Sequence, residues 1–170
     1  MHKDELEAAL SLLEIDFDII AITETKIIKN IKPTGYDEPQ HIPTESFKGG
    51  AMIYVKHGIE VKRRPDLESR IYESGKLETV FLEIINTTEK NIIFGCVYRH
   101  PSMDINSFNE KYLNDTIAKL TEERKICYLA GDFNIDLLKS DSDNHSKDFF
   151  DTITSNLFVP HITLPTRITN

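Results

Sequence analysis

The segment Ile126-Cys127-Tyr128-Leu129-Ala130-Gly131-Asp132-Phe133-Asn134 carries the strongest structural signal in the chain. Its first residues are uncharged and mostly apolar, which predicts a strand buried on both faces with polar groups at its end. Because side chains alternate along an extended segment, Asp132 and Asn134 would share one face and Phe133 would anchor the other. A carboxylate that can orient water or a hard cation, beside an amide donor, suits phosphate-ester chemistry; an Asx-type turn is the alternative interpretation.

Composition limits the class of protein. The chain has 170 residues, of which 39% are hydrophobic, so we expect a single α/β-sized domain with a real core. Its net charge of -8 argues against a general basic surface for nucleic acid, so phosphate binding would depend on local clusters or a metal. Cys96 and Cys127 lie in apolar runs, which favours reduced thiols and an intracellular protein. We expect no membrane span and no signal peptide.

Hydrophobic periodicity predicts alternating helices and strands. The helices are expected at 4–14, at 107–120 and around 149–157. Strands are expected at 18–23, at 49–55 continuing as a β-meander into 59–61, in a hairpin of 77–85 with 92–98, and near 162–164.

Two more strand ends carry candidate functional groups. Glu24 follows the strand 18–23 and is a candidate ligand for a hard cation, although a solvated loop glutamate would give the same pattern. Lys26 begins a small basic cluster that could meet a phosphate backbone or simply be solvated. Tyr98 and Arg99 end the strand 92–98, and both can donate to phosphate oxygens; Tyr98 could equally be a packing residue.

Four motifs in order carry a family resemblance. They are Ile22–Lys26, Gly49–Val55, Val97–Pro101 and Gly131–Asn134, with a trailing Leu164–Thr169. Together they resemble the endonuclease/exonuclease/phosphatase superfamily, and are most similar to the apurinic-type endonuclease domain of non-LTR retrotransposons. The resemblance implies a DNase I-like α/β fold, a four-layered sandwich of two mixed β-sheets flanked by helices. It also implies Mg²⁺- or Mn²⁺-dependent cleavage of DNA, with a reverse transcriptase region in the full-length product.

The resemblance also implies roles for the candidate residues. Glu24 would be the metal ligand and Tyr98 a phosphate contact. Asp132 would orient or deprotonate the attacking water, and Asn134 would hold the scissile phosphate and help to position Asp132. Thr166 would be a weaker DNA-facing residue, beside Lys26 and Arg99 as candidate substrate contacts.

Two family features are missing from the sequence. Family members begin with a strand that ends in a metal-binding asparagine, and they finish with a serine-aspartate-histidine motif. His161 has no serine-aspartate before it and does not take that role. We therefore expect residues 1–170 to be a partial domain, monomeric and with little or no activity in isolation.

Two alternatives stay open. The chain could be a non-catalytic remnant of the fold, or a family member that cleaves a phosphoinositide, sphingomyelin or nucleotide phosphodiester. DNA as a substrate would suggest the nucleus, but no basic import run is present.

Overall fold

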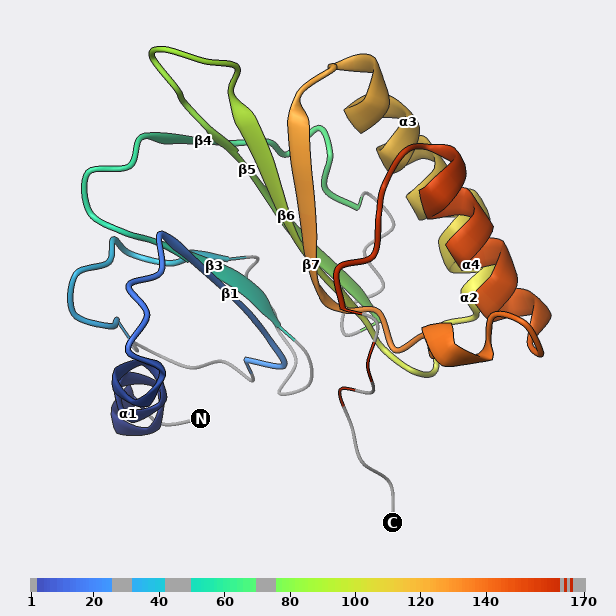
Figure 1. The fold of residues 1–170 in the computed structure, drawn as a ribbon, viewed down its shortest axis with the longest axis horizontal. Coiled ribbons are helices and arrows are strands. Elements are labelled where there is room, and N and C mark those ends of the chain that lie inside the picture. Colours follow the sequence, from blue (N-terminus) through green and yellow to red (C-terminus); the bar gives the residue numbers. More distant parts are fainter. Residues whose placement is uncertain are drawn as a thin grey trace. The chain divides into compact units, whose positions relative to one another are not determined.

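The computed structural model describes residues 3–25, 32–41, 50–69, 76–162, 164 and 166, and it divides into two compact units (Figure 1). The first unit comprises Met1–His100 and Lys125–Phe133. The second comprises Pro101–Arg124 and Asn134–Asn170. The chain therefore leaves the first unit after His100, returns to it for one strand, and leaves it again after Phe133.

The first unit opens with a helix that covers a small antiparallel sheet. Helix α1 (Lys3–Leu13) precedes β1 (Ile19–Thr23), β2 (Gln40–His41) and β3 (Ala51–Val55), which pair in the order β1-β3-β2. The predicted helix and both predicted strands are confirmed. One cluster joins α1 to the outer face of this sheet through Leu6, Leu10, Ile20, Ile22, Tyr36, Met52 and Tyr54.

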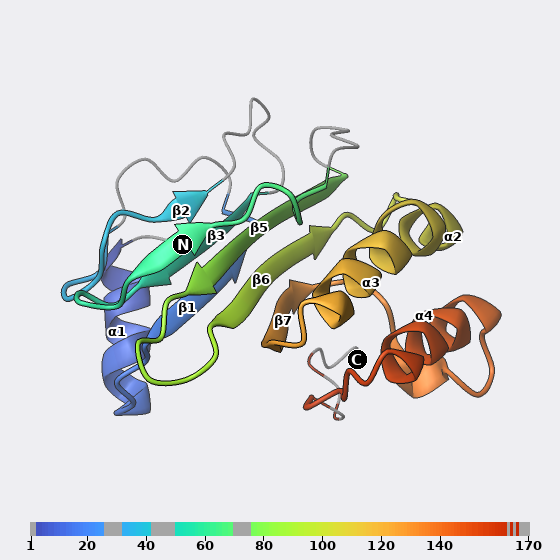
Figure 2. The ribbon, with the colours of Figure 1, turned by 90° about the horizontal axis from the view of Figure 1, so that it is seen from above.

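The second sheet of this unit has the order β4-β5-β6-β7. It contains β4 (Val61–Arg63), β5 (Leu77–Ile84), β6 (Ile92–Arg99) and β7 (Ile126–Asp132). The predicted hairpin of β5 and β6 is confirmed and is visible in Figure 2. The predicted β-meander is wrong, because β3 belongs to the first sheet whereas β4 pairs with β5 in the second. Strand β7 runs parallel to β6.

The core of the first unit lies between its two sheets. Alternate residues of β3, β5 and β6 meet there, as the period of two along a strand requires. Cys96 is part of this core, and burial raises the pKa of its thiol to about 12. Both cysteines are free, as the sequence predicts. The cluster is built from Ala51, Ile53, Val55, Val80, Leu82, Cys96 and Tyr98.

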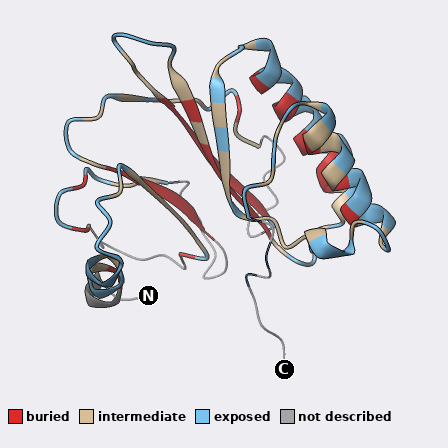
Figure 3. Cartoon of the chain, viewed as in Figure 1, coloured by how far each residue is buried: buried red, intermediate tan, exposed pale blue. Residues whose placement is uncertain are grey.

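Strand β7 is less buried than its sequence predicts. Ile126 is 53% exposed and Tyr128 is 49% exposed. Within the second sheet, Figure 3 shows the buried residues on β5 and β6, with intermediate and exposed colours along β7. The prediction of burial on both faces is wrong because β7 is the last strand of its sheet among the described residues.

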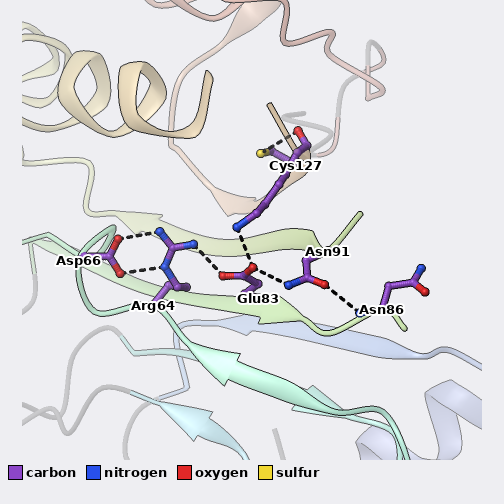
Figure 4. Close-up of polar contacts among 7 residues, drawn as sticks. Arg64, Asp66, Glu83, Asn86, Asn91 and Cys127 are labelled. Atoms are coloured by element: carbon purple, nitrogen blue, oxygen red, sulfur yellow. Dashed lines mark hydrogen bonds and ion pairs between the residues drawn. The ribbon is translucent and has the colours of Figure 1, made fainter. Parts of the chain in front are cut away.

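A polar network stabilises one end of the second sheet (Figure 4). Tyr98 and Asp132 lie at the other end, where β6 and β7 finish. Glu83 of β5 accepts from Lys125 Nζ at 2.7 Å and from Arg64 Nη1 at 2.9 Å. Its Oε1 also accepts from the Asn91 amide at 2.8 Å. These bonds, led by the one from Lys125, lower the pKa of Glu83 to about 2. A carboxylate with these three donors stays ionised and joins β5 to the start of β7.

The second unit is helical. Helices α2 (Ile105–Phe108) and α3 (Asn114–Glu122) continue into one another through a π-helical turn, η1 (Asn109–Leu113), so the predicted helix at 107–120 is confirmed. A 3-10 turn, η2 (Leu137–Lys139), precedes α4 (Asn144–Ser155). The rings of Phe108 and Phe149 stack with centroids 6.3 Å apart. The described residues after α4 form no strand, so the strand expected near 162–164 is not observed there.

The described helices include none with the length and apolar character needed to cross a membrane.

Candidate active site

The carboxyl ends of β6 and β7 lie side by side because these two strands are parallel. Their register pairs Tyr98 with Asp132, and the antiparallel register of β5 pairs Glu78 with Tyr98. Paired residues of neighbouring strands project from the same face of a sheet. Glu78, Tyr98 and Asp132 therefore form a row across three strands, at the strand ends where the sequence predicts Tyr98 and Asp132.

A further carboxylate reaches this row from the first sheet. Glu24 follows β1 with a left-handed φ of 55° and is exposed. The Tyr98 hydroxyl donates to Glu24 Oε1 at 3.2 Å. The sequence argument assumed a parallel-type strand before Glu24, but β1 is antiparallel to β3. The structure nevertheless brings Glu24, Tyr98 and Asp132 to one place.

Electrostatics at the Tyr98 phenol reflect this convergence. Desolvation, followed by the negative charges of Glu24, Asp132 and Glu78, raises the pKa of Tyr98 to about 12. The phenol consequently stays protonated at neutral pH and acts as a hydrogen-bond donor. Three carboxylates around one neutral donor create a negative potential that favours a cation.

Glu78 is a site residue that the sequence argument missed. Its residue is 1% exposed, and its carboxylate accepts a hydrogen bond from the Gly50 N–H. The alternation of β5 places it on the same face as the core residues Val80 and Leu82. A charged residue at a core-facing position is rare without a specific role, and that pattern was the available signal.

Gly50 contacts residues on both sides of the row: its backbone lies against Thr25, and its N–H donates to Glu78. Gly50 has a φ of 110°, and a Cβ there would lie 1.9 Å from the Thr25 Oγ1. Thr25 is buried, so this contact fixes the turn that carries Glu24. The predicted Gly49–Val55 motif thus includes one described glycine, Gly50, that serves both Glu24 and Glu78.

Arg99 does not lie where a phosphate could reach it. The residue is 2% exposed, and its Nε donates to the Phe133 carbonyl at 2.6 Å. Its Nη1 donates to the His100 carbonyl at 3.4 Å. The prediction of Arg99 as a substrate contact is therefore corrected, because alternation along β6 turns its side chain to the face opposite Tyr98.

The other predicted site residues belong to the second unit or lie outside the described residues. Asn134 begins the second unit with a left-handed φ of 51°, and β7 ends at Asp132. The alternation that was used to align Asn134 with Asp132 consequently stops before Asn134. Thr166 is exposed in the second unit, and Lys26 lies outside the described residues.

The chemistry of the donors suits a hard cation. Glu24 and Asp132 offer carboxylate oxygens near the Tyr98 phenol. Within the described ranges, no three His, Cys, Asp or Glu side chains come close enough to hold a metal unaided. Mg²⁺ is commonly bound by one or two carboxylates, with waters and substrate phosphate completing its shell. The donor set therefore suits Mg²⁺ that binds together with a phosphate.

The sequence itself matches no family model and no curated protein. The structure is similar to that of D. rerio TDP2 complexed with a single-strand DNA product, with a TM-score of 0.56 and 11% identity over 94% of this chain and 58% of that chain. It is also similar to D. rerio TDP2 humanized by 14 mutations, with a TM-score of 0.53 and 14% identity over 94% of this chain and 60% of that chain.

The chain spans less than two thirds of the length of these two solved structures. The likeness shows that the chain shares the DNase I-like fold of these two structures. The predicted α/β fold class, with two sheets and helices, is therefore confirmed.

Proposed function

We propose that the chain is part of a metal-dependent phosphodiesterase domain, and more specifically of a DNA endonuclease from a non-LTR retrotransposon. The observation that carries this proposal is the convergence of Glu24 and Asp132 on the Tyr98 phenol. The DNase I-like fold supports it, as does the single-strand DNA product bound to D. rerio TDP2. The proposal includes a monomeric, intracellular protein whose residues 1–170 form one incomplete domain, joined to a reverse transcriptase region in the full-length product.

The described residues can divide the work of phosphodiester hydrolysis among them. Asp132 would orient water for attack on phosphorus, while the protonated Tyr98 hydroxyl would donate to a phosphate oxygen. Glu24, with Asp132, would hold Mg²⁺ or Mn²⁺, which when bound would polarise the phosphoryl oxygen and stabilise the leaving oxygen. Asn134 directly follows the Phe133 carbonyl in sequence and would hold the scissile phosphate through its amide. Thr166, which is exposed, would contact the DNA backbone, as would Lys26, which lies outside the described residues.

Nicking of supercoiled plasmid in the presence of Mg²⁺ tests the proposal. The assay uses this chain and a longer product that contains it, each with the variants Asp132→Ala and Asp141→Asn. Asp141 is an exposed acid in the second unit and serves as the matched control. We expect little or no nicking by this chain alone, and nicking by the longer product that Asp132→Ala abolishes and Asp141→Asn leaves intact. Cleavage that Asp132→Ala does not change would contradict the assignment.

A smaller phosphodiester is the second candidate substrate. It is favoured because the basic triplet Lys62-Arg63-Arg64, which could bind a DNA backbone, is largely paired within the protein. Arg63 pairs with Glu68 at 2.9 Å, and Arg64 pairs with Asp66 at 2.7 Å as well as with Glu83. Two of the three cations are therefore already engaged within the protein, which weakens their use as a DNA-binding surface. Turnover of abasic DNA, plain DNA and lipid head-group phosphodiesters would separate the two substrates.

A further inference from the structure

Asp132 is the residue on which the proposed chemistry depends most, and both of its neighbours in sequence are held by β6. Gly131 has a φ of 130°, and a Cβ there would lie 2.0 Å from the Val97 carbonyl oxygen. Only a glycine allows the two backbones to approach this closely. The residue before Asp132 is thus held against the residue before Tyr98.

The residue after Asp132 is held in an equivalent way. The Phe133 carbonyl accepts from Arg99 Nε at 2.6 Å. Arg99 follows Tyr98 directly, so the two residues that flank Tyr98 contact the two residues that flank Asp132. The central pair of the strand register, Tyr98 and Asp132, is therefore fixed from both sides.

The type of bond matters because β7 ends at Asp132. Asn134 then turns into the left-handed region with a φ of 51°, so the extended backbone of β7 does not continue. A charged guanidinium donating to a carbonyl makes a stronger hydrogen bond than a neutral pair, and burial strengthens it further. Arg99 therefore holds, through a side chain, the backbone that follows the end of β7.

We propose that Arg99 is a positioning residue that fixes the Phe133 carbonyl to β6 and so sets the orientation of Asp132 beside Tyr98. This inference rests on the proposed hydrolytic role of Asp132. Arg99 itself does not touch the substrate, because it is 2% exposed on the face opposite Tyr98. Its side chain acts on the reaction only through the backbone of the turn that follows β7.

The test compares Arg99→Gln and Arg99→Lys with the parent chain. Because removal of a buried charged group can prevent folding, Arg99→Lys keeps the charge and loses only the fork geometry of the guanidinium. Arg63→Gln is the control, since Arg63 is an arginine of the same sheet that is held by a partner within the protein, Glu68, but lies on β4. Each variant is measured by hydrogen exchange at residues 131–134 and by nicking kinetics at several salt concentrations.

We expect exchange at residues 132–134 to accelerate in both Arg99 variants while the rest of the second sheet keeps its protection. Where nicking is measurable, kcat should fall about 10- to 100-fold, as is typical when a supporting residue is lost, with KM within about twofold. Arg63→Gln should change neither the exchange at residues 132–134 nor the nicking kinetics. Unchanged exchange at 132–134 would overturn the inference, as would a KM increase with a salt slope reduced by about 1, which marks a lost phosphate contact.

The exchange measurement keeps this inference separate from the proposed function. If neither the parent nor a longer product cleaves any phosphodiester, the proposed function fails. Faster exchange at 132–134 in the Arg99 variants would still show that Arg99 holds the backbone of these residues.

Discussion

Strand β5 carries two nearly buried glutamates whose surroundings differ. Glu83 lies near one end of the strand, where Lys125, Arg64 and Asn91 donate to it and lower its pKa to about 2. Glu78 lies near the other end, next to Tyr98, whose pKa is raised to about 12 in part by Glu78, Glu24 and Asp132. One strand thus holds one carboxylate that stabilises cations of the protein and another that belongs to a cluster of like charges.

The difference separates a structural site from a functional one. At Glu83 the positive and negative groups are matched within the chain, so the network stabilises the native sheet. At Glu78 three carboxylates converge on one neutral phenol, which makes this end of the sheet the candidate for binding a cation. We infer that the Tyr98 end of the sheet is the end that meets a ligand.

The largest expected effect comes from Asp132→Asn, which keeps the shape of the side chain and removes its charge. Nicking should fall by about 10³- to 10⁴-fold, because residues that act as a unit in catalysis give large single losses. The free energy of unfolding should change by no more than about 1 kcal/mol, since the shape of the side chain is kept. Plasmid nicking and urea unfolding measure the two quantities. Equal nicking by Asp132→Asn and Asp141→Asn would contradict the assignment of the site.

A large effect on stability is expected from Gly131→Ala. The new Cβ would lie 2.0 Å from the Val97 carbonyl oxygen, at a φ of 130° that an alanine rarely adopts. We expect a loss of about 3 kcal/mol in the free energy of unfolding. Gly58→Ala is the control, because Gly58 also has a positive φ, of 90°, but no atom within 4 Å of the added carbon; it should cost about 1 kcal/mol. Equal losses in the two variants would show that the approach to Val97 is unimportant.

A moderate effect on activity is expected from Tyr98→Phe, which removes the hydroxyl that donates to Glu24 at 3.2 Å. Loss of a donor that stabilises developing charge typically costs about 10²-fold in kcat. Stability should change by no more than about 1 kcal/mol, since only one hydrogen bond is lost. Nicking rates and thermal unfolding measure both. Tyr36→Phe, which loses a hydroxyl bonded to the Phe17 carbonyl at 2.7 Å, should keep full activity.

The smallest expected effect concerns the Glu83 network and depends on pH. Because folding lowers the pKa of Glu83 from 4.5 to about 2, its contribution to stability is present above pH 4.5 and disappears as the pH falls towards 2. Glu83→Gln should therefore be less stable than the parent at pH 7, by on the order of 2 kcal/mol, and equally stable near pH 2. Urea unfolding across this pH range measures the difference. A constant difference at every pH would show that the charge of Glu83 is not responsible.

Local patterns in the sequence predicted the elements of the first unit well. The leucines of α1 and the polar turn between β5 and β6 are local signals, and both elements are confirmed. The assignment of strands to sheets is not local, so the sequence could not show that β3 and β4 belong to different sheets. The burial of β7 was also overestimated, because an apolar run does not reveal whether a strand has one neighbour or two.

The candidate site was predictable only in part. Strand ends and the family motifs indicated Glu24, Tyr98 and Asp132, which the structure brings together. Glu78 was missed because a glutamate in an alternating strand normally faces solvent, and only the register with Tyr98 reveals its position. Arg99 was misassigned because the sequence does not show that its guanidinium bonds the Phe133 carbonyl, a partner 34 residues away.

Titration with Mn²⁺ followed by nuclear magnetic resonance is the most direct test of the claim that Glu24, Tyr98 and Asp132 form one cation-attracting site. Paramagnetic Mn²⁺ should broaden the amide signals of these three residues first, at the lowest metal concentration, and Asp132→Asn should abolish this selective broadening. Broadening that begins instead at exposed acids such as Asp141, or that Asp132→Asn leaves unchanged, would contradict the claim.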